Sequence, residues 1–171
     1  MNLPLWIALP TAALVALAAW TDLRTRRIPN RLTGPALLIA IAAHASVNGL
    51  PGLQAALLGM LIAGGLLLPG WFAGWMGAGD VKLMAAVGAW LGAPQAFTAL
   101  LATLMAGGLM AAALALRRGV LVQSVRNAAW MGAWIAGGAK VAVPEPVTSG
   151  IRFPFALAAL AGVAVAMVCT P

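Results

Sequence analysis

Long apolar runs dominate this sequence and constrain its fold more than any other feature. There are about six, separated by glycine, proline and charged residues: roughly Leu3–Trp20, Thr33–Val47, Leu53–Gly70, Asp80–Leu91, Ala96–Leu116 and Phe153–Cys169. A transmembrane helix needs about 20 mostly apolar residues, whereas a membrane β-barrel shows short alternating segments. The runs therefore predict an all-α integral membrane protein with about six transmembrane helices. The fourth run is short, so we expect a helix that begins below the membrane surface.

The composition agrees with a chain embedded in a lipid bilayer. It is 63% hydrophobic and 8% charged, whereas a soluble domain carries about 25% charged residues. So few polar side chains cannot cover a surface in water, and we expect a single membrane domain over residues 1–171. No basic stretch precedes the first apolar run, so we interpret the N-terminus as a retained first span rather than a signal peptide.

The basic residues predict the orientation in the membrane. With six spans, all of them fall on one side: Arg24, Arg26, Arg27, Arg31, Lys82, Arg117, Arg118, Arg126, Lys140 and Arg152. The positive-inside rule makes that side cytoplasmic and puts both termini on the non-cytoplasmic side. Because topology explains the net charge of +7, we expect no nucleic-acid partner. The long cytoplasmic connection 117–152 includes Val120–Ile135, a predicted interfacial helix.

Two of the three acidic residues, Asp22 and Asp80, lie at the ends of apolar runs. Each has a structural explanation: Asp80 as a helix N-cap, and Asp22 as a partner of the arginines that follow it. However, Asp22 comes after a predicted helix end, where a negative charge opposes the helix dipole. Asp80 follows Gly77 and Gly79, which let the backbone turn tightly and another segment approach. A membrane protein that keeps carboxylates near hydrocarbon tends to use them.

If the two carboxylates are close together, they hold one proton between them. The ionised member then takes a proton from water while the protonated member polarises a peptide carbonyl, as in aspartic proteases. This chemistry needs no metal, serine or cysteine, and the chain has one His and one Cys.

The residues around both aspartates resemble the motifs of the type IV prepilin peptidases. The first is DLRTRRIPN and the second is GAGDVKL, a GxGD signature; RFPFALAALAG is similar to the start of the last span in short members. The resemblance implies catalytic Asp22 and Asp80. It implies supporting roles for five motif residues: Pro29, Asn30, Gly77, Gly79 and Lys82. It further implies a multi-pass protein of the bacterial inner membrane that cleaves the basic leader from prepilins or pseudopilins at the cytoplasmic face.

The chain departs from the larger relatives, which carry two CxxC pairs for zinc and also methylate the mature pilin. With one cysteine, Cys169, it resembles the compact Flp/Tad-type members, so we expect no metal, cofactor or N-methyltransferase activity. The main alternative is a small proton- or ion-coupled transporter that uses Asp22 and Asp80; a lipid-modifying transferase and an inert assembly factor are further alternatives. Lys82 has a second interpretation as a snorkelling residue, and His44 is interpreted as a buried structural histidine. The particular prepilin and the oligomeric state are left open.

Overall fold

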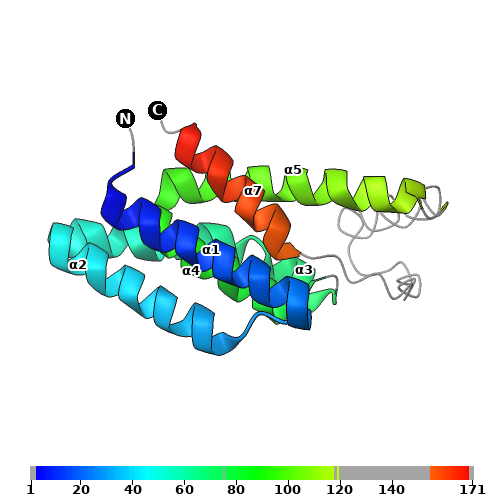
Figure 1. The fold of residues 1–171 in the computed structure, drawn as a ribbon. Coiled ribbons are helices and arrows are strands. Elements are labelled where there is room, and N and C mark those ends of the chain that lie inside the picture. Colours follow the sequence, from blue (N-terminus) through cyan, green and yellow to red (C-terminus); the bar gives the residue numbers. More distant parts are fainter. Residues whose placement is uncertain (1–2, 75, 118, 120–154, 170–171) are drawn as a thin grey trace, which may run out of the picture. The chain divides into compact units, whose positions relative to one another are not determined.

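The computed structural model describes residues 3–74, 76–117, 119 and 155–169, and the described chain is helical, with no strand among these residues. The elements, in the numbering of Figure 1, are α1 (Leu5–Thr25), α2 (Asn30–Met60), a π-helix (Leu61–Gly65), α3 (Leu68–Phe72), α4 (Ala78–Leu91), α5 (Ala93–Arg117) and α7 (Phe155–Val168). The all-α prediction is therefore confirmed.

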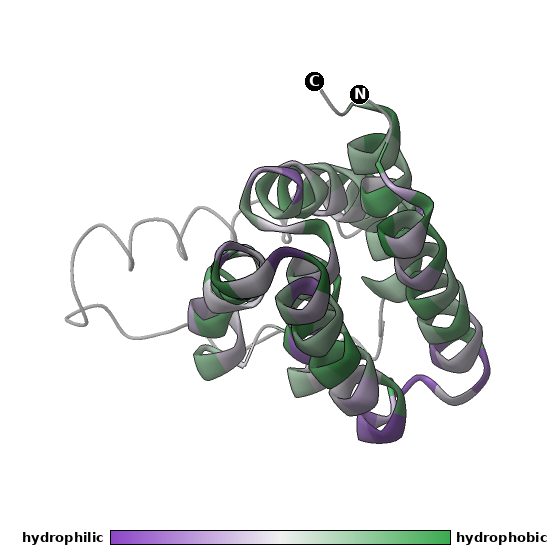
Figure 2. Cartoon of the chain, turned by 90° about the vertical axis from the view of Figure 1, so that its left-hand side faces the viewer, coloured by the Kyte–Doolittle hydropathy of each residue, from purple (hydrophilic) through white to green (hydrophobic). Residues whose placement is uncertain are grey.

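Three stretches are long and apolar enough to cross a membrane: Leu5–Thr25, Asn30–Phe72 and Ala93–Arg117. Hydrophobic residues cover most of the described helices in Figure 2. The 14-residue helix α4 is short, as its apolar run predicted, and α7 also has 14 residues. The count of six spans and the placement of the termini stay predictions.

The second of these stretches is not one straight helix. Inside α2, Gly49 has φ 60° and ψ −141°, a conformation that suits glycine and few other residues. Pro51 follows, and Gly52 packs so closely on the backbone of His44 that a Cβ there would collide with the His44 carbonyl. The chain turns back at this point (Figure 1), so α2 has two arms. They correspond to the second and third apolar runs of the sequence.

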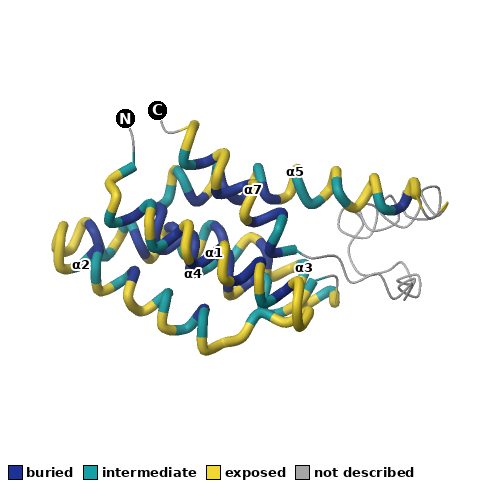
Figure 3. The backbone as a smooth tube through the Cα atoms, in the orientation of Figure 1, coloured by how far each residue is buried: buried dark blue, intermediate teal, exposed yellow. Residues whose placement is uncertain are grey.

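Helix α4 forms the centre of the core. Nine of its residues are buried (Figure 3), and it contacts α1, α2, the π-helix and α7. Its closest approach to α2 is made by Gly59 and Gly88, since a Cβ on either would collide with the carbonyl of the other. Next to this contact, a Cβ on Gly64 would come within 2.7 Å of the Ala85 Cβ. Such small residues let helix backbones approach closely in membrane proteins.

The chain divides into two compact units, Met1–Gly107 with Pro154–Pro171, and Gly108–Phe153. The first contains α1 to α4, the start of α5 and α7, and it holds every candidate site residue. The described part of the second is the end of α5 and Gly119. The predicted interfacial helix Val120–Ile135 lies outside the described residues, and the single-domain interpretation stays a prediction.

Candidate active site

Asp22 lies in the last turn of α1 and is buried, with 7% of its surface exposed. The sequence placed it just after a helix end, but α1 continues to Thr25, so the aspartate is inside the helix. Its Oδ2 accepts a hydrogen bond from the backbone N–H of Ala156 at 3.3 Å. Ala156 is in the first turn of α7, where unpaired N–H groups and the helix dipole favour a negative charge. The start of α7 therefore stabilises a carboxylate at the end of α1.

The turn after α1 runs from Arg26 to Pro29. Arg26 adopts a left-handed conformation with φ 52°, and its N–H donates to the Asp22 carbonyl at 2.8 Å. Pro29 is extended and immediately precedes α2, which begins at Asn30. Arg24 does not point at the carboxylate but lies over the ring of Trp20, 4.2 Å from its centroid. The first motif is therefore a tight turn that leads from Asp22 to the start of α2.

Asp80 lies in the first turn of α4 and is half-buried. The N-cap residue of α4 is Gly77, so the interpretation of Asp80 as the N-cap is wrong. Asp80 stands three residues later and reaches back, and its Oδ2 accepts the Gly77 N–H at 3.2 Å. This bond satisfies one of the free N–H groups of the helix start. The second carboxylate is thus held at a helix N-terminus, as the first one is.

The two motifs contact each other. A Cβ built on Gly79 would lie 3.3 Å from the Ile28 Cβ and 3.5 Å from the Ile28 carbonyl oxygen. A few residues on, Lys82 Nζ donates a hydrogen bond to Asn30 Oδ1 at 3.0 Å. The missing side chain of Gly79 therefore makes room for the turn, and Lys82 ties the start of α2 to α4.

These contacts place the end of α1, which carries Asp22, beside the start of α4, which carries Asp80. Each carboxylate has one oxygen held by a backbone N–H group, from Ala156 and from Gly77. Such a pair can act as a base toward water and as an acid toward a carbonyl.

The structure brings all seven site residues predicted from the sequence into one region around the α1–α2 turn and the start of α4. It adds two groups to which the sequence assigned no role. Ile28 packs on Gly79, and the Ala156 backbone N–H binds Asp22. Both residues lie inside motifs that were recognised in the sequence. The role of Ala156 could not be predicted, because every residue except proline has a backbone N–H.

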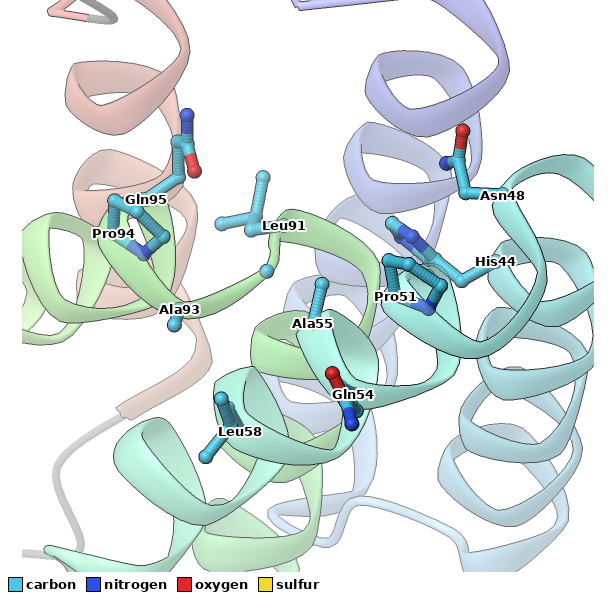
Figure 4. Close-up of a pocket in the computed structure, with 12 residues that line it drawn as sticks. His44, Asn48, Pro51, Gln54, Ala55, Leu58, Leu91, Ala93, Pro94 and Gln95 are labelled. Atoms are coloured by element: carbon cyan, nitrogen blue, oxygen red, sulfur yellow. The ribbon is translucent and has the colours of Figure 1, made fainter.

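A cavity of about 660 Å³ lies elsewhere, between the bend of α2 and the α4–α5 turn (Figure 4). It is lined by residues that include His44, Asn48, Gln54, Leu91 and Gln95. Leu91 is the last residue of α4, whereas Asp80 is in its first turn. At a rise of 1.5 Å per residue, these two positions are about 16 Å apart along the helix. The cavity is therefore separate from the two carboxylates.

His44, at the edge of this cavity, is buried and hydrogen-bonded, as predicted. It is 5% exposed, and its Nε2 lies 3.0 Å from the Trp90 carbonyl oxygen. Because a carbonyl only accepts, Nε2 carries the proton and donates. The ring also makes an edge contact with Trp6, with centroids 5.0 Å apart. Among the described residues, no group of three or more His, Cys, Asp or Glu side chains could hold a metal ion.

The described residues form an all-helical fold with three stretches apolar enough to cross a membrane, and they place Asp22 and Asp80 beside the contact between the two motifs. The sequence model of the type IV leader peptidase family matches residues 9–114, more than half of the chain, including both aspartate motifs. The chain therefore belongs to the type IV leader peptidase family. This membership indicates a protein-cleaving hydrolase, and the apolar helices indicate a membrane protein. No match was found among curated proteins or among solved structures.

Proposed function

We propose that this protein is an intramembrane aspartyl endopeptidase that removes the basic leader from a prepilin or pseudopilin. In this proposal Asp22 and Asp80 are the catalytic pair, and the cut is made at the cytoplasmic face of the bacterial inner membrane. The observation that carries the proposal is the contact between the two aspartate motifs. Ile28 lies against Gly79, and Asn30 binds Lys82.

The reaction follows from a pair of carboxylates that holds one proton. The ionised carboxylate removes a proton from water, whose oxygen attacks the scissile carbonyl carbon. The protonated carboxylate donates a hydrogen bond to the carbonyl oxygen and stabilises its developing charge. Collapse of the tetrahedral intermediate breaks the C–N bond, and a proton passes to the leaving nitrogen. Nearby core residues such as Val81 and Leu83 are buried, which lowers the local dielectric and strengthens these interactions.

The surroundings of the pair fit a substrate whose cleaved bond adjoins an apolar helix. Arg24, Arg26 and Arg27 are exposed on and after the end of α1, beside the predicted cytoplasmic surface. A substrate helix in the bilayer would present its cytoplasmic junction at the same level. We expect no methylation of the product, because the chain has no counterpart of the CxxC-bearing insert of the larger relatives.

The test is co-expression with a Flp-type prepilin, followed by immunoblotting for the shortened product. We expect cleavage by the wild type and none by Asp22→Asn or Asp80→Asn, with all three proteins present in the membrane fraction. Asn is close in size to Asp but cannot serve as a base, so these variants change the chemistry and little of the packing. Arg31→Met, an exposed change beside the turn, is the matched control. Cleavage that survives either aspartate substitution would refute the assignment of the pair.

A further inference from the structure

The hydrogen bond between Lys82 and Asn30 joins the two motifs by their side chains. Lys82 lies on α4 shortly after Asp80, and Asn30 is the first residue of α2. The Lys82 Nζ and Asn30 Oδ1 atoms are 3.0 Å apart. A short turn connects Asn30 to the end of α1, so a bond that fixes Asn30 against α4 also limits where Asp22 can lie.

We propose that Lys82 is a positioning residue for the catalytic pair. It holds the α1–α2 turn against α4 and thereby sets the placement of Asp22 relative to Asp80. This inference rests on the proposed aspartyl peptidase function and adds a role for Lys82 in the same site.

The bond is the directional part of the contact between the two motifs. Ile28 against Gly79 is an apolar contact, which resists separation but allows sliding. A bond from an ammonium group to an amide oxygen is charge-assisted and has a preferred direction. The hydrogen bond therefore holds the α1–α2 turn at one position along the axis of α4. The apolar contact alone would allow other positions.

The location of the bond argues against a purely stabilising role. Lys82 and Asn30 are both exposed, where water offers the ammonium equally good partners and the net gain from a hydrogen bond is small. The ammonium also lies at the N-terminus of α2, the positive end of that helix dipole, where a cation is unfavourable. We therefore expect loss of this bond to change the position of the turn more than the free energy of unfolding.

The charges around Lys82 are consistent with this role. The exposed Arg31 follows Asn30 directly in α2 and adds a second cation at the helix start. The Asn30 oxygen is neutral and so binds Lys82 without drawing a negative charge toward the catalytic pair. A carboxylate at position 30 would hold the lysine more strongly but would add a third negative group to the site.

The first experiment measures kcat and KM for prepilin cleavage in membranes. We expect Lys82→Met to lower kcat by roughly 10- to 100-fold with KM unchanged, the size of loss that a small misplacement of catalytic groups produces. Lys82→Arg, which still donates, recovers much of the activity. Asn30→Ala gives a similar loss, and adding Lys82→Met to it causes little further loss because both remove one interaction. Arg31→Met is the control for loss of a nearby positive charge and leaves kcat unchanged.

The second experiment reads the position of the pair without catalysis. In a Cys169→Ser background, Asp22→Cys with Asp80→Cys is treated in membranes with a short thiol cross-linker. We expect efficient cross-linking that falls when Lys82→Met is added and persists with Arg31→Met. This readout works even where the enzyme is inactive.

The outcomes separate the two proposals. A wild type that cleaves no prepilin overturns the proposed function, whereas the cross-linking still tests the position of the pair. Wild-type kcat or unchanged cross-linking in Lys82→Met overturns the positioning role. A raised KM with unchanged kcat also overturns it, because Lys82 would then contact the substrate instead.

Discussion

Asp22 and Ala156 are 134 residues apart in the sequence, yet the Ala156 N–H donates to Asp22 Oδ2 at 3.3 Å. The last described helix therefore contributes to a site whose side chains all come from the first half of the chain. The contact also explains how a carboxylate is accommodated at the C-terminal end of α1. The unfavourable dipole of α1 is offset by the N-terminus of α7.

The first prediction concerns the catalytic pair as a unit. Asp22→Asn and Asp80→Asn should each lower kcat for leader cleavage by roughly 10⁴-fold, and the double variant should be no worse than either, because groups that act together are not additive. Single-turnover cleavage in detergent, with purified variants of equal thermal stability, measures this. Multiplied losses in the double variant would indicate that the two carboxylates act independently.

The second prediction concerns the space beside Gly79. Gly79→Ala places a Cβ 3.3 Å from the Ile28 Cβ, so the turn has to move away from α4, and kcat should fall by roughly tenfold or more. Adding Ile28→Gly removes the Ile28 Cβ, the nearest atom to the new side chain, and should restore part of the loss. Gly65→Ala, where no heavy atom lies within 4 Å of the new Cβ, is the control. Equal activity of Gly79→Ala and wild type would contradict the close contact.

The third prediction concerns the helix contact at Gly88. A Val side chain there meets the Gly59 carbonyl and lies 2.7 Å from the Ala63 Cβ, so α2 and α4 have to separate. We expect Gly88→Val to destabilise the protein by about 3 kcal/mol or more, seen as a lower melting temperature in detergent. Gly65→Val is the matched control in the neighbouring open position. An unchanged melting temperature in Gly88→Val would show that the helices do not pack at this point.

The fourth prediction is that His44 contributes to stability and not to catalysis. His44→Ala leaves the Trp90 carbonyl without its donor and should cost about 1–3 kcal/mol of stability. It should leave kcat unchanged, because His44 lies near the opposite end of α4 from Asp80. Thermal unfolding and cleavage kinetics on the same sample measure both effects. A loss of kcat without a loss of stability would give His44 a role in the reaction that its location does not suggest.

Much of the site could be predicted from the sequence because its residues sit in two short segments. Gly77 to Lys82 and Asp22 to Asn30 are each local, so their patterns were readable without tertiary contacts. The bond from Ala156 was not predictable, since any backbone N–H can donate and only the fold decides which one reaches Asp22. The contact of Gly59 with Gly88 was also missed, because isolated glycines in apolar runs do not reveal their partners.

The ends of the helices were harder to predict than their existence. Asp22 was expected after a helix, but the left-handed Arg26 shows that α1 ends later. The apolar run stops before Thr21, whereas helical hydrogen bonding continues to Thr25. A helix end predicted from the hydrophobic pattern is therefore too early. The start of α4 was predicted at Asp80, two residues too late. Gly77 and Ala78 are not strongly hydrophobic, although the helix is capped at Gly77 and begins at Ala78.

In the proposed membrane topology, the bend at Gly49 also determines on which side of the membrane each later residue lies. A straight helix from Asn30 to Phe72 would carry the chain across once, and the α1–α2 turn and the start of α4 would then face opposite compartments. The reversal adds a crossing, so the number of crossings between Asp22 and Asp80 becomes even. In that topology, a single glycine with a positive φ lets two residues 58 positions apart (80 minus 22) face the same aqueous compartment.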